Sequence, residues 1–264
     1  MPLLEHVLEL RNRLAISGLA LLVGTVLMWF FFNPVWDFLK QPYCHVPQSH
    51  RLSGESCALV VTGIFEGFFL RLKVSFILGI VVSCPIWLYE IWAFITPALR
   101  QRERRWTVTF LSCAVPLFGA GAVLAYVTLS KGLEFLLGVN PHDVLALVTV
   151  SSYLSFALAM LLIFGISFEF PLVLVLLNFM GVLSYRRLRS WWRPMVLGIF
   201  VFAAVATPSQ DPFTMSALAV PMSVLYWIAV GVAYLHDKRK ARREAESPFA
   251  DLSDDEASPL EPAF

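Results

Sequence analysis

The sequence contains few charged residues for its length. Asp, Glu, Lys and Arg make up 15% of the 264 residues, whereas they make up about 25% of a typical soluble protein. Hydrophobic residues account for 58% of the chain, and the mean hydropathy is +0.71. This composition excludes an ordinary soluble domain and indicates an integral membrane protein. The net charge is only +1 and there is no long basic arm, so nucleic acid is not an expected partner.

The sequence also lacks the common motifs of catalysis. It has no glycine-rich phosphate loop, no recognisable nucleophile–base pair, and no cysteine or histidine cluster with the spacing of a metal site. We therefore predict that the protein is not an enzyme and needs no cofactor or metal ion.

Only four cysteines are present. Cys84 and Cys113 lie within apolar runs and are expected to be unreactive thiols in the interior. Cys44 and Cys57 flank a polar loop and lie 13 residues apart. If that loop faces an oxidising compartment, the two could form a disulfide, which would stabilise the fold by about 2–4 kcal/mol. The alternative is two free thiols.

Long apolar runs dominate the sequence. They predict an all-α fold with six transmembrane helices, because a membrane-spanning helix needs about 20 apolar residues. The fifth run is too short, since its 13 residues would cross only about 20 Å of a hydrocarbon core that is about 30 Å thick. Either the bilayer is thin there, or other helices shelter the turn that follows. The predicted spans are Leu14–Phe32, Phe68–Trp92, Trp106–Thr128, Tyr153–Met180, Met195–Thr207 and Phe213–Leu235.

The basic residues predict the orientation. Fifteen of the twenty Lys and Arg residues precede the first span, follow the sixth, or lie in the second-to-third and fourth-to-fifth connections. The positive-inside rule places these segments, and hence both termini, in the cytoplasm. The outer connections Lys40–Glu66 and Leu129–Ser152 contain aromatic and apolar residues, so we expect them to form a cap with short helices. Residues 1–237 would form the transmembrane domain, and residues 238–264 a basic, then acidic, disordered tail.

Glu169 is the most informative residue, because it lies deep inside the fourth predicted span. A carboxylate at the centre of a membrane helix costs about 2.5–3.5 kcal/mol on insertion scales. It is therefore expected to face the protein interior or a wet cavity, and it is a candidate functional residue. Pro171 follows two positions later and can bend the helix beside the acid. A neutral carboxyl hydrogen-bonded between helices is the alternative.

Three further acidic residues stand out. Glu9 lies in an amphipathic segment and forms an i,i+4 pair with Arg13, which could either bind a ligand or merely stabilise the helix. Glu103 is the only acid in a loop with four arginines, so it could bind a basic ligand or form a salt bridge within the loop. Asp211 lies in the short hairpin before Pro212, where it can cap the sixth helix or take a direct functional role.

Together these segments resemble one family, TatC, the multi-spanning receptor subunit of the twin-arginine protein translocase. The resemblance covers nearly the whole chain up to about residue 237. The motifs that carry it are His6-x-x-Glu9-Leu10-Arg11-x-Arg13, Trp92-x-Phe94-x-x-Pro97-x-Leu99-x-x-x-Glu103, Ser151-x-Tyr153-x-Ser155-Phe156, Gly165-x-Ser167-Phe168-Glu169-x-Pro171, and Thr207-Pro208 followed by Asp211.

The resemblance implies a fold and a function. It implies a glove-like concave arrangement of six helices in the bacterial cytoplasmic membrane, with short fifth and sixth helices. It implies that Glu9, Arg11, Phe94 and Glu103 bind the paired arginines of a signal peptide on a folded cargo protein, and that Glu169 faces the concave cavity. The implied partners are single-span subunits of the TatA and TatB type, membrane lipid and further copies of the chain, with export driven by the proton-motive force.

The chain departs from the family in two places. Met215 stands where several relatives carry a glutamine proposed to contact partner subunits, and neither the Cys44/Cys57 pair nor the acidic tail is general in the family. Two other functions are weighed against the receptor. A proton-coupled small-solute transporter could use Glu169 as its carrier, but such proteins usually show repeated halves with broken helices, which we do not find here. A membrane insertase or scaffold would bind paired-lysine and paired-arginine peptides alike.

Overall fold

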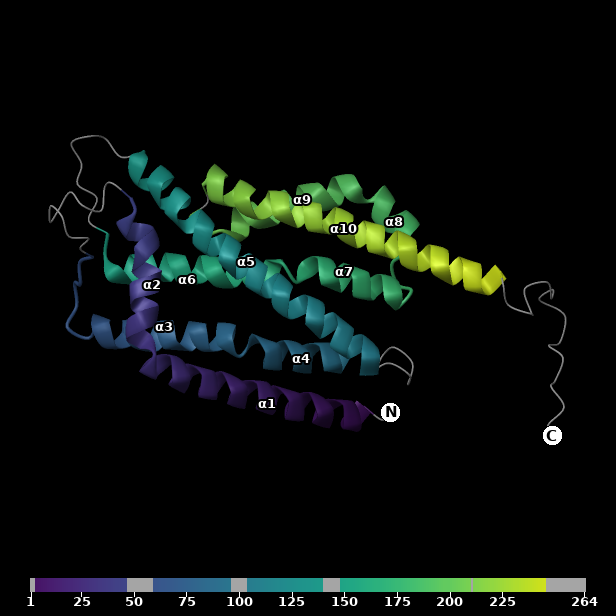
Figure 1. Cartoon of the computed structure of the whole chain (residues 1–264), viewed down its shortest axis with the longest axis horizontal. Helices are drawn as coiled ribbons and strands as arrows, with labels where there is room; N and C mark the ends of the chain where they lie inside the picture. The colour runs from purple at the N-terminus through teal and green to yellow at the C-terminus, as the bar shows by residue number, and fades with distance from the viewer. Residues whose placement is uncertain (1–2, 47–58, 96–103, 140–147, 210, 246–264) are drawn as a thin grey trace.

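Figure 1 shows the computed structural model of the chain, which describes residues 3–46, 59–95, 104–139, 148–209 and 211–245. Helices α1 to α10 make up the described fold, and the β-type pairing within it is a single parallel bridge between Val60 and Thr149. The predicted all-α fold class is therefore confirmed.

Six helical segments correspond to the six predicted spans. Among the described residues, four are long and apolar enough to cross a membrane: Val7–Phe30, Val108–Gly138, Val150–Phe179 and Pro212–Arg242. Helices α3 (Glu66–Val82) and α4 (Cys84–Ile95) can form a fifth crossing, bent by 54°. Helix α9 (Trp192–Ala206) is the shorter apolar segment, as predicted, with 15 residues.

The second span is broken, which we did not predict. Ser83 separates α3 from α4, and its carbonyl accepts hydrogen bonds from the backbone N–H groups of Ile86 and Trp87. Pro85 is the second residue of α4. A proline fits the first turn of a helix because the amide hydrogen that it lacks would have no helical partner there.

The fourth span is interrupted beside Glu169. Helix α6 (Val150–Ser167) ends two residues before Glu169, and α7 (Phe170–Phe179) has Glu169 at its N-cap position and Pro171 in its first turn. The carbonyl of Glu169 accepts the backbone N–H groups of Leu172 and Val173, so α7 begins beside the acid.

Three helices extend beyond the predicted boundaries. Helix α1 (Leu3–Phe30) is followed directly by α2 (Phe32–Cys44), so the first outer connection begins as a helix. Helix α5 (Arg104–Gly138) continues ten residues past the predicted end at Thr128. The prediction of a short sixth helix is wrong, because α10 (Pro212–Ala245) has 34 residues. Its apolar part is followed by Lys, Arg, Ala and Glu, which favour helix, so the predicted tail is helical up to Ala245.

The helices pack closely where glycines meet backbone. Helix α1 lies along α3, and the Cβ of an alanine at Gly24 would stand 2.8 Å from the carbonyl oxygen of Gly79. Helix α5 crosses α6, and a Cβ at Gly121 would stand 2.5 Å from the carbonyl oxygen of Phe164. Small residues allow this close approach, which is how membrane helices commonly associate.

The two ends of the molecule differ. Figure 1 shows the start of α1, the end of α4, the start of α5 and the end of α10 at one end, which we call the terminal end. Helix α2, the end of α5 and the start of α6 lie at the other end, which we call the outer end. Both described chain ends thus lie on the same side of the bundle, as the charge distribution predicted.

Candidate functional site

Arg13 connects the first helix to the fourth at the terminal end. Its Nη2 and Nε atoms donate to Oε1 of Glu9 at 2.7 and 3.1 Å, and its Nη1 atom donates to Oε2 of Glu90 at 3.0 Å. Glu9 and Arg13 lie one turn apart on α1, as predicted, whereas Glu90 lies on α4. The side chain of Glu90 is only 11% exposed, against 33% for Glu9.

Sequence reasoning missed Glu90. It lies inside the second predicted span, and its partner Arg13 is 77 positions away. The signal available in the sequence was a carboxylate placed in an apolar run, the same signal that drew attention to Glu169. Such a residue needs a partner or a wet surface, and Glu90 has a partner in Arg13.

The other predicted ligand-binding residues lie in different surroundings. Phe94 is one helical turn after Glu90 on α4 and is half-buried. Arg11 is exposed, and its guanidinium donates to Asn12 at 3.4 Å. Glu103 lies outside the described residues; Arg104, which follows it, begins α5 at the terminal end. The structure therefore places Glu9, Arg11 and Phe94 at one end of the molecule.

Glu169 is placed at the break between α6 and α7. Both of its carboxylate oxygens are buried, and neither has a hydrogen-bond partner among the described residues. The alternative of a carboxyl hydrogen-bonded between helices is therefore wrong for this structure. Cys84, at the start of α4, interacts electrostatically with Glu169.

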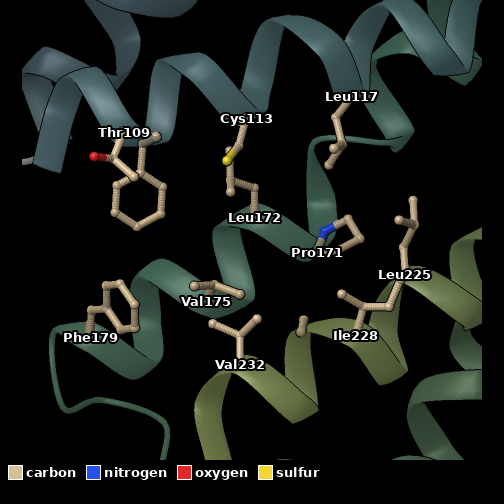
Figure 2. Close-up of a pocket in the computed structure, with 12 residues that line it drawn as sticks. Thr109, Cys113, Leu117, Pro171, Leu172, Val175, Phe179, Leu225, Ile228 and Val232 are labelled. Carbon is tan, nitrogen blue, oxygen red and sulfur yellow. The ribbon is translucent and has the colours of Figure 1, made fainter. Parts of the chain in front are cut away.

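An apolar cavity of about 290 Å³ lies beside α7, between α5 and α10. Figure 2 shows Cys113 and Leu117 of α5, Pro171 and Val175 of α7, and Val232 of α10 among the side chains that surround it. Its lining surface is entirely apolar. Such a cavity suits an aliphatic segment of a ligand, lipid or partner helix and does not suit a polar solute.

A second polar cluster joins α7, α8 (Tyr185–Ser190) and α10 at the terminal end. The side-chain amide of Asn178 donates to Oδ1 of Asp237 at 3.0 Å and to the carbonyl oxygen of Leu183 at 2.8 Å. The backbone N–H of Tyr185 donates to Oδ2 of Asp237 at 2.8 Å. Asp237 therefore satisfies donors from two segments, and its role is structural.

Asp211 begins α10 as predicted. Its Oδ1 accepts the backbone N–H of Thr214 at 2.8 Å, and Pro212 is the first residue of the helix. Burial would raise the pKa of the Asp211 carboxyl, but hydrogen bonds from Ser209, Thr214 and Phe213 lower it, and the net result is a pKa below the ordinary value. The residue is 5% exposed, so it serves the hairpin as a buried cap.

The predicted outer-end bridge is only partly described. Cys44 forms a disulfide, and Cys84 and Cys113 are free thiols. Cys57, the predicted partner of Cys44, lies outside the described residues, so the pairing stays a prediction. Within the described residues, no group of three His, Cys, Asp or Glu residues is arranged to hold a metal ion.

The chain is similar in sequence and in structure to known proteins of one family. Residues 5–221 match the family model described as Sec-independent protein translocase protein (TatC). TatC of Frankia casuarinae is 50% identical over 99% of this chain and 73% of its own length, and TatC of Escherichia coli K12 is 35% identical over 92% of both chains. A crystal structure of the twin arginine translocase receptor TatC superposes with a TM-score of 0.73 at 34% identity, covering 86% of this chain and 99% of the other.

Proposed function

Since this chain belongs to the TatC family of Sec-independent protein translocase proteins, we propose that it is the receptor and core subunit of a twin-arginine translocase. It binds the paired-arginine signal peptide of a folded cargo protein and nucleates the export complex, which the proton-motive force drives. It is a multi-span membrane protein and a non-enzymatic part of a transport machine.

We propose that the terminal end faces the cytoplasm. Fifteen of the twenty Lys and Arg residues belong to segments that begin or end there, and the positive-inside rule places such segments in the cytoplasm. The outer end would then face the exterior of the bacterial cytoplasmic membrane. That side is oxidising, which agrees with a disulfide at Cys44.

One observation carries the assignment of the binding surface. The salt bridge between Arg13 and Glu90 holds α1 beside α4, so that Glu9 and Phe94 are presented at the same end of the molecule. Glu103 directly precedes Arg104, the first residue of α5, in the sequence. A signal peptide lying on this surface would meet Glu9 and Glu103 with its arginines, and Phe94 with its apolar residues. Charged hydrogen bonds of arginine to a carboxylate are strong and directional.

The remaining features are given roles that follow from their chemistry. The apolar part of the signal peptide enters the bundle past Glu169. The carboxyl of Glu169, which has no hydrogen-bond partner in the described part of the chain, offers a polar contact at membrane depth. Single-span partner subunits of the TatA and TatB type gather near α9, because a helix of 15 residues is short for a bilayer and leaves a thinned region. A small-solute transporter is less well supported, because the cavity beside α7 is lined by apolar surface.

The binding of signal peptides to Glu103→Gln tests this proposal. The full-length protein in lipid nanodiscs would be titrated with a fluorescent signal peptide that carries Arg-Arg, and with a matched Lys-Lys peptide. We expect wild type to prefer the Arg-Arg peptide and Glu103→Gln to lose about 2–5 kcal/mol of binding free energy, because it leaves a cargo arginine without its partner.

Glu134→Gln is the matched control. Glu134 is a surface residue at the outer end of α5 that pairs with Lys131, so it should bind like wild type. Equal affinity of wild type for the two peptides would contradict the receptor function and favour an insertase or scaffold. Unchanged affinity in Glu103→Gln would contradict the assignment of that residue.

A further inference from the structure

We propose that Glu90 is a further acidic residue of the signal-peptide site, and that Arg13 occupies in the resting protein the place that a cargo guanidinium takes on binding. This inference rests on the proposed function and adds to it one binding residue and an exchange of arginines. The observation that carries it is the arrangement of two carboxylates, from two different helices, around one guanidinium.

The geometry is that of a clamp for a single guanidinium. The three hydrogen bonds of Arg13 to Glu9 and Glu90 are 2.7 to 3.1 Å long and use one oxygen of each carboxylate. Two carboxylates and one arginine leave the clamp with a net charge of −1. Without a cation the carboxylates would repel each other across the α1–α4 contact, so the resting protein benefits from supplying its own arginine.

The clamp distinguishes arginine from lysine. The planar guanidinium offers five N–H donors in a fixed fork, and it can therefore bridge acceptors that approach from two directions. A lysine ammonium is a compact, strongly hydrated charge on a flexible stem and cannot reproduce that bridge. A site built from Glu9 on α1 and Glu90 on α4 thus selects the residue that the signal peptide carries.

The clamp is also reachable from outside. The side chains of Glu9 and Arg13 are 33% and 22% exposed, whereas that of Glu90 is 11% exposed. Glu90 forms the desolvated inner wall, and Glu9 with Arg13 forms the outer edge, from which Arg13 can swing into solvent. A charged hydrogen bond at such a half-buried position contributes more than one at a fully exposed surface. The second cargo arginine is left for Glu103.

The experiment compares two variants that break the same salt bridge from opposite sides. Glu90→Gln and Arg13→Gln would each be prepared as full-length protein in nanodiscs and titrated with the Arg-Arg and Lys-Lys peptides described above. We expect Glu90→Gln to weaken binding of the Arg-Arg peptide by at least about tenfold. We expect Arg13→Gln to bind it more tightly than wild type, because the internal competitor is gone. Both variants should lose similar thermal stability.

Opposite changes in affinity separate a binding role from a structural one. If the ion pair only fastens α1 to α4, the two variants will weaken binding equally, and the proposal is overturned. Unchanged affinity in Glu90→Gln overturns it as well. If wild type prefers Arg-Arg and Glu103→Gln loses that preference while Glu90→Gln keeps it, this inference alone fails. If wild type shows no preference, the proposed function fails and the clamp fails with it.

Discussion

Asn178 and Asp237 lie 59 positions apart in the sequence, yet the amide nitrogen of one is 3.0 Å from a carboxylate oxygen of the other. The second oxygen of Asp237 accepts the backbone N–H of Tyr185. One carboxylate thus ties the end of α7 and the start of α8 to the last turns of α10. The long α10 is thereby held to α7 and α8 at the terminal end of the molecule.

Removing that carboxylate should destabilise the fold. In Asp237→Ala, the amide of Asn178 and the N–H of Tyr185 lose their acceptor, and each unsatisfied donor costs about 1–3 kcal/mol. We expect a clear fall in the thermal unfolding midpoint of the protein in detergent. Asp37→Ala is the matched control, because Asp37 is exposed and pairs with Lys40 one helical turn away, and it should change the midpoint little. Equal midpoints for the two variants would contradict a structural role for Asp237.

The close contact of α5 with α6 makes a second prediction. Gly121→Ala would place a Cβ 2.5 Å from the carbonyl oxygen of Phe164. This oxygen belongs to the backbone and cannot swing aside, so the helices must separate. We expect a loss of about 1–3 kcal/mol of stability, as for other overpacked sites. At Gly119, two residues earlier on the same helix, an added Cβ would have no described atom within 4 Å apart from the neighbouring backbone of its own helix.

Gly119→Ala therefore isolates the effect of the contact from that of helix propensity. Alanine is the better helix former by about 0.5–1 kcal/mol, so this control should unfold at the same temperature as wild type or slightly higher. The measurement is the thermal midpoint of both variants in one detergent. A midpoint for Gly121→Ala equal to that of Gly119→Ala would mean that the α5–α6 contact is looser than the structure shows.

Acid should weaken the α9–α10 hairpin through Asp211. Its pKa is lower in the folded protein than the ordinary value of 3.8. The ionised Asp211 carboxylate therefore stabilises the fold fully above the ordinary pKa. This stabilisation is lost as the pH falls through the lower pKa that Asp211 has in the folded protein. We expect the thermal midpoint to fall less steeply with acid in Asp211→Asn, which keeps an acceptor for the N–H of Thr214 but does not titrate. If the thermal midpoint changes with pH by the same amount in wild type and in the variant between about pH 6 and about pH 2, Asp211 does not contribute to the acid sensitivity of the fold.

The sequence predicted the features that depend on local pattern. The apolar runs predicted the six helical segments, and Pro171 drew attention to the place beside Glu169 where the fourth span is interrupted. Pro85 likewise lies in the first turn of a helix within the second span. We missed the break at Ser83 because no acidic residue lies directly beside Pro85. The length of α10 was missed because its continuation is polar, and we took polarity after the sixth span as the start of a disordered tail.

Contacts between distant segments could not be predicted in this way. Glu90 is a carboxylate in an apolar run, but the sequence does not identify Arg13, 3.0 Å away, as its partner. It does not identify the contact of Asp237 with Asn178 either. No periodicity or spacing in a single sequence states which helices are neighbours. The resemblance to a family supplied Glu9, Phe94 and Glu103 as candidates, but it did not supply Glu90, which the structure added.

Glu169 should reveal a conflict between stability and function. Its two carboxylate oxygens are buried without a hydrogen-bond partner among the described residues, and a buried polar group without a partner lowers stability. We therefore expect Glu169→Leu to unfold at a higher temperature than wild type while exporting much less cargo. Residues that cost stability in the resting state are typical of functional sites.

Glu169→Gln decides which property of the side chain export requires. Glutamine keeps the polar shape but does not ionise, so a residue that acts as a polar contact for the signal peptide should retain much of its activity as Gln. Export of a folded reporter and crosslinking of the Arg-Arg peptide would be measured for both variants. Surface binding through Glu103 should persist in each. If Gln is as inactive as Leu, ionisation of Glu169 is required, and proton transfer at this residue becomes the better explanation of its place in the membrane.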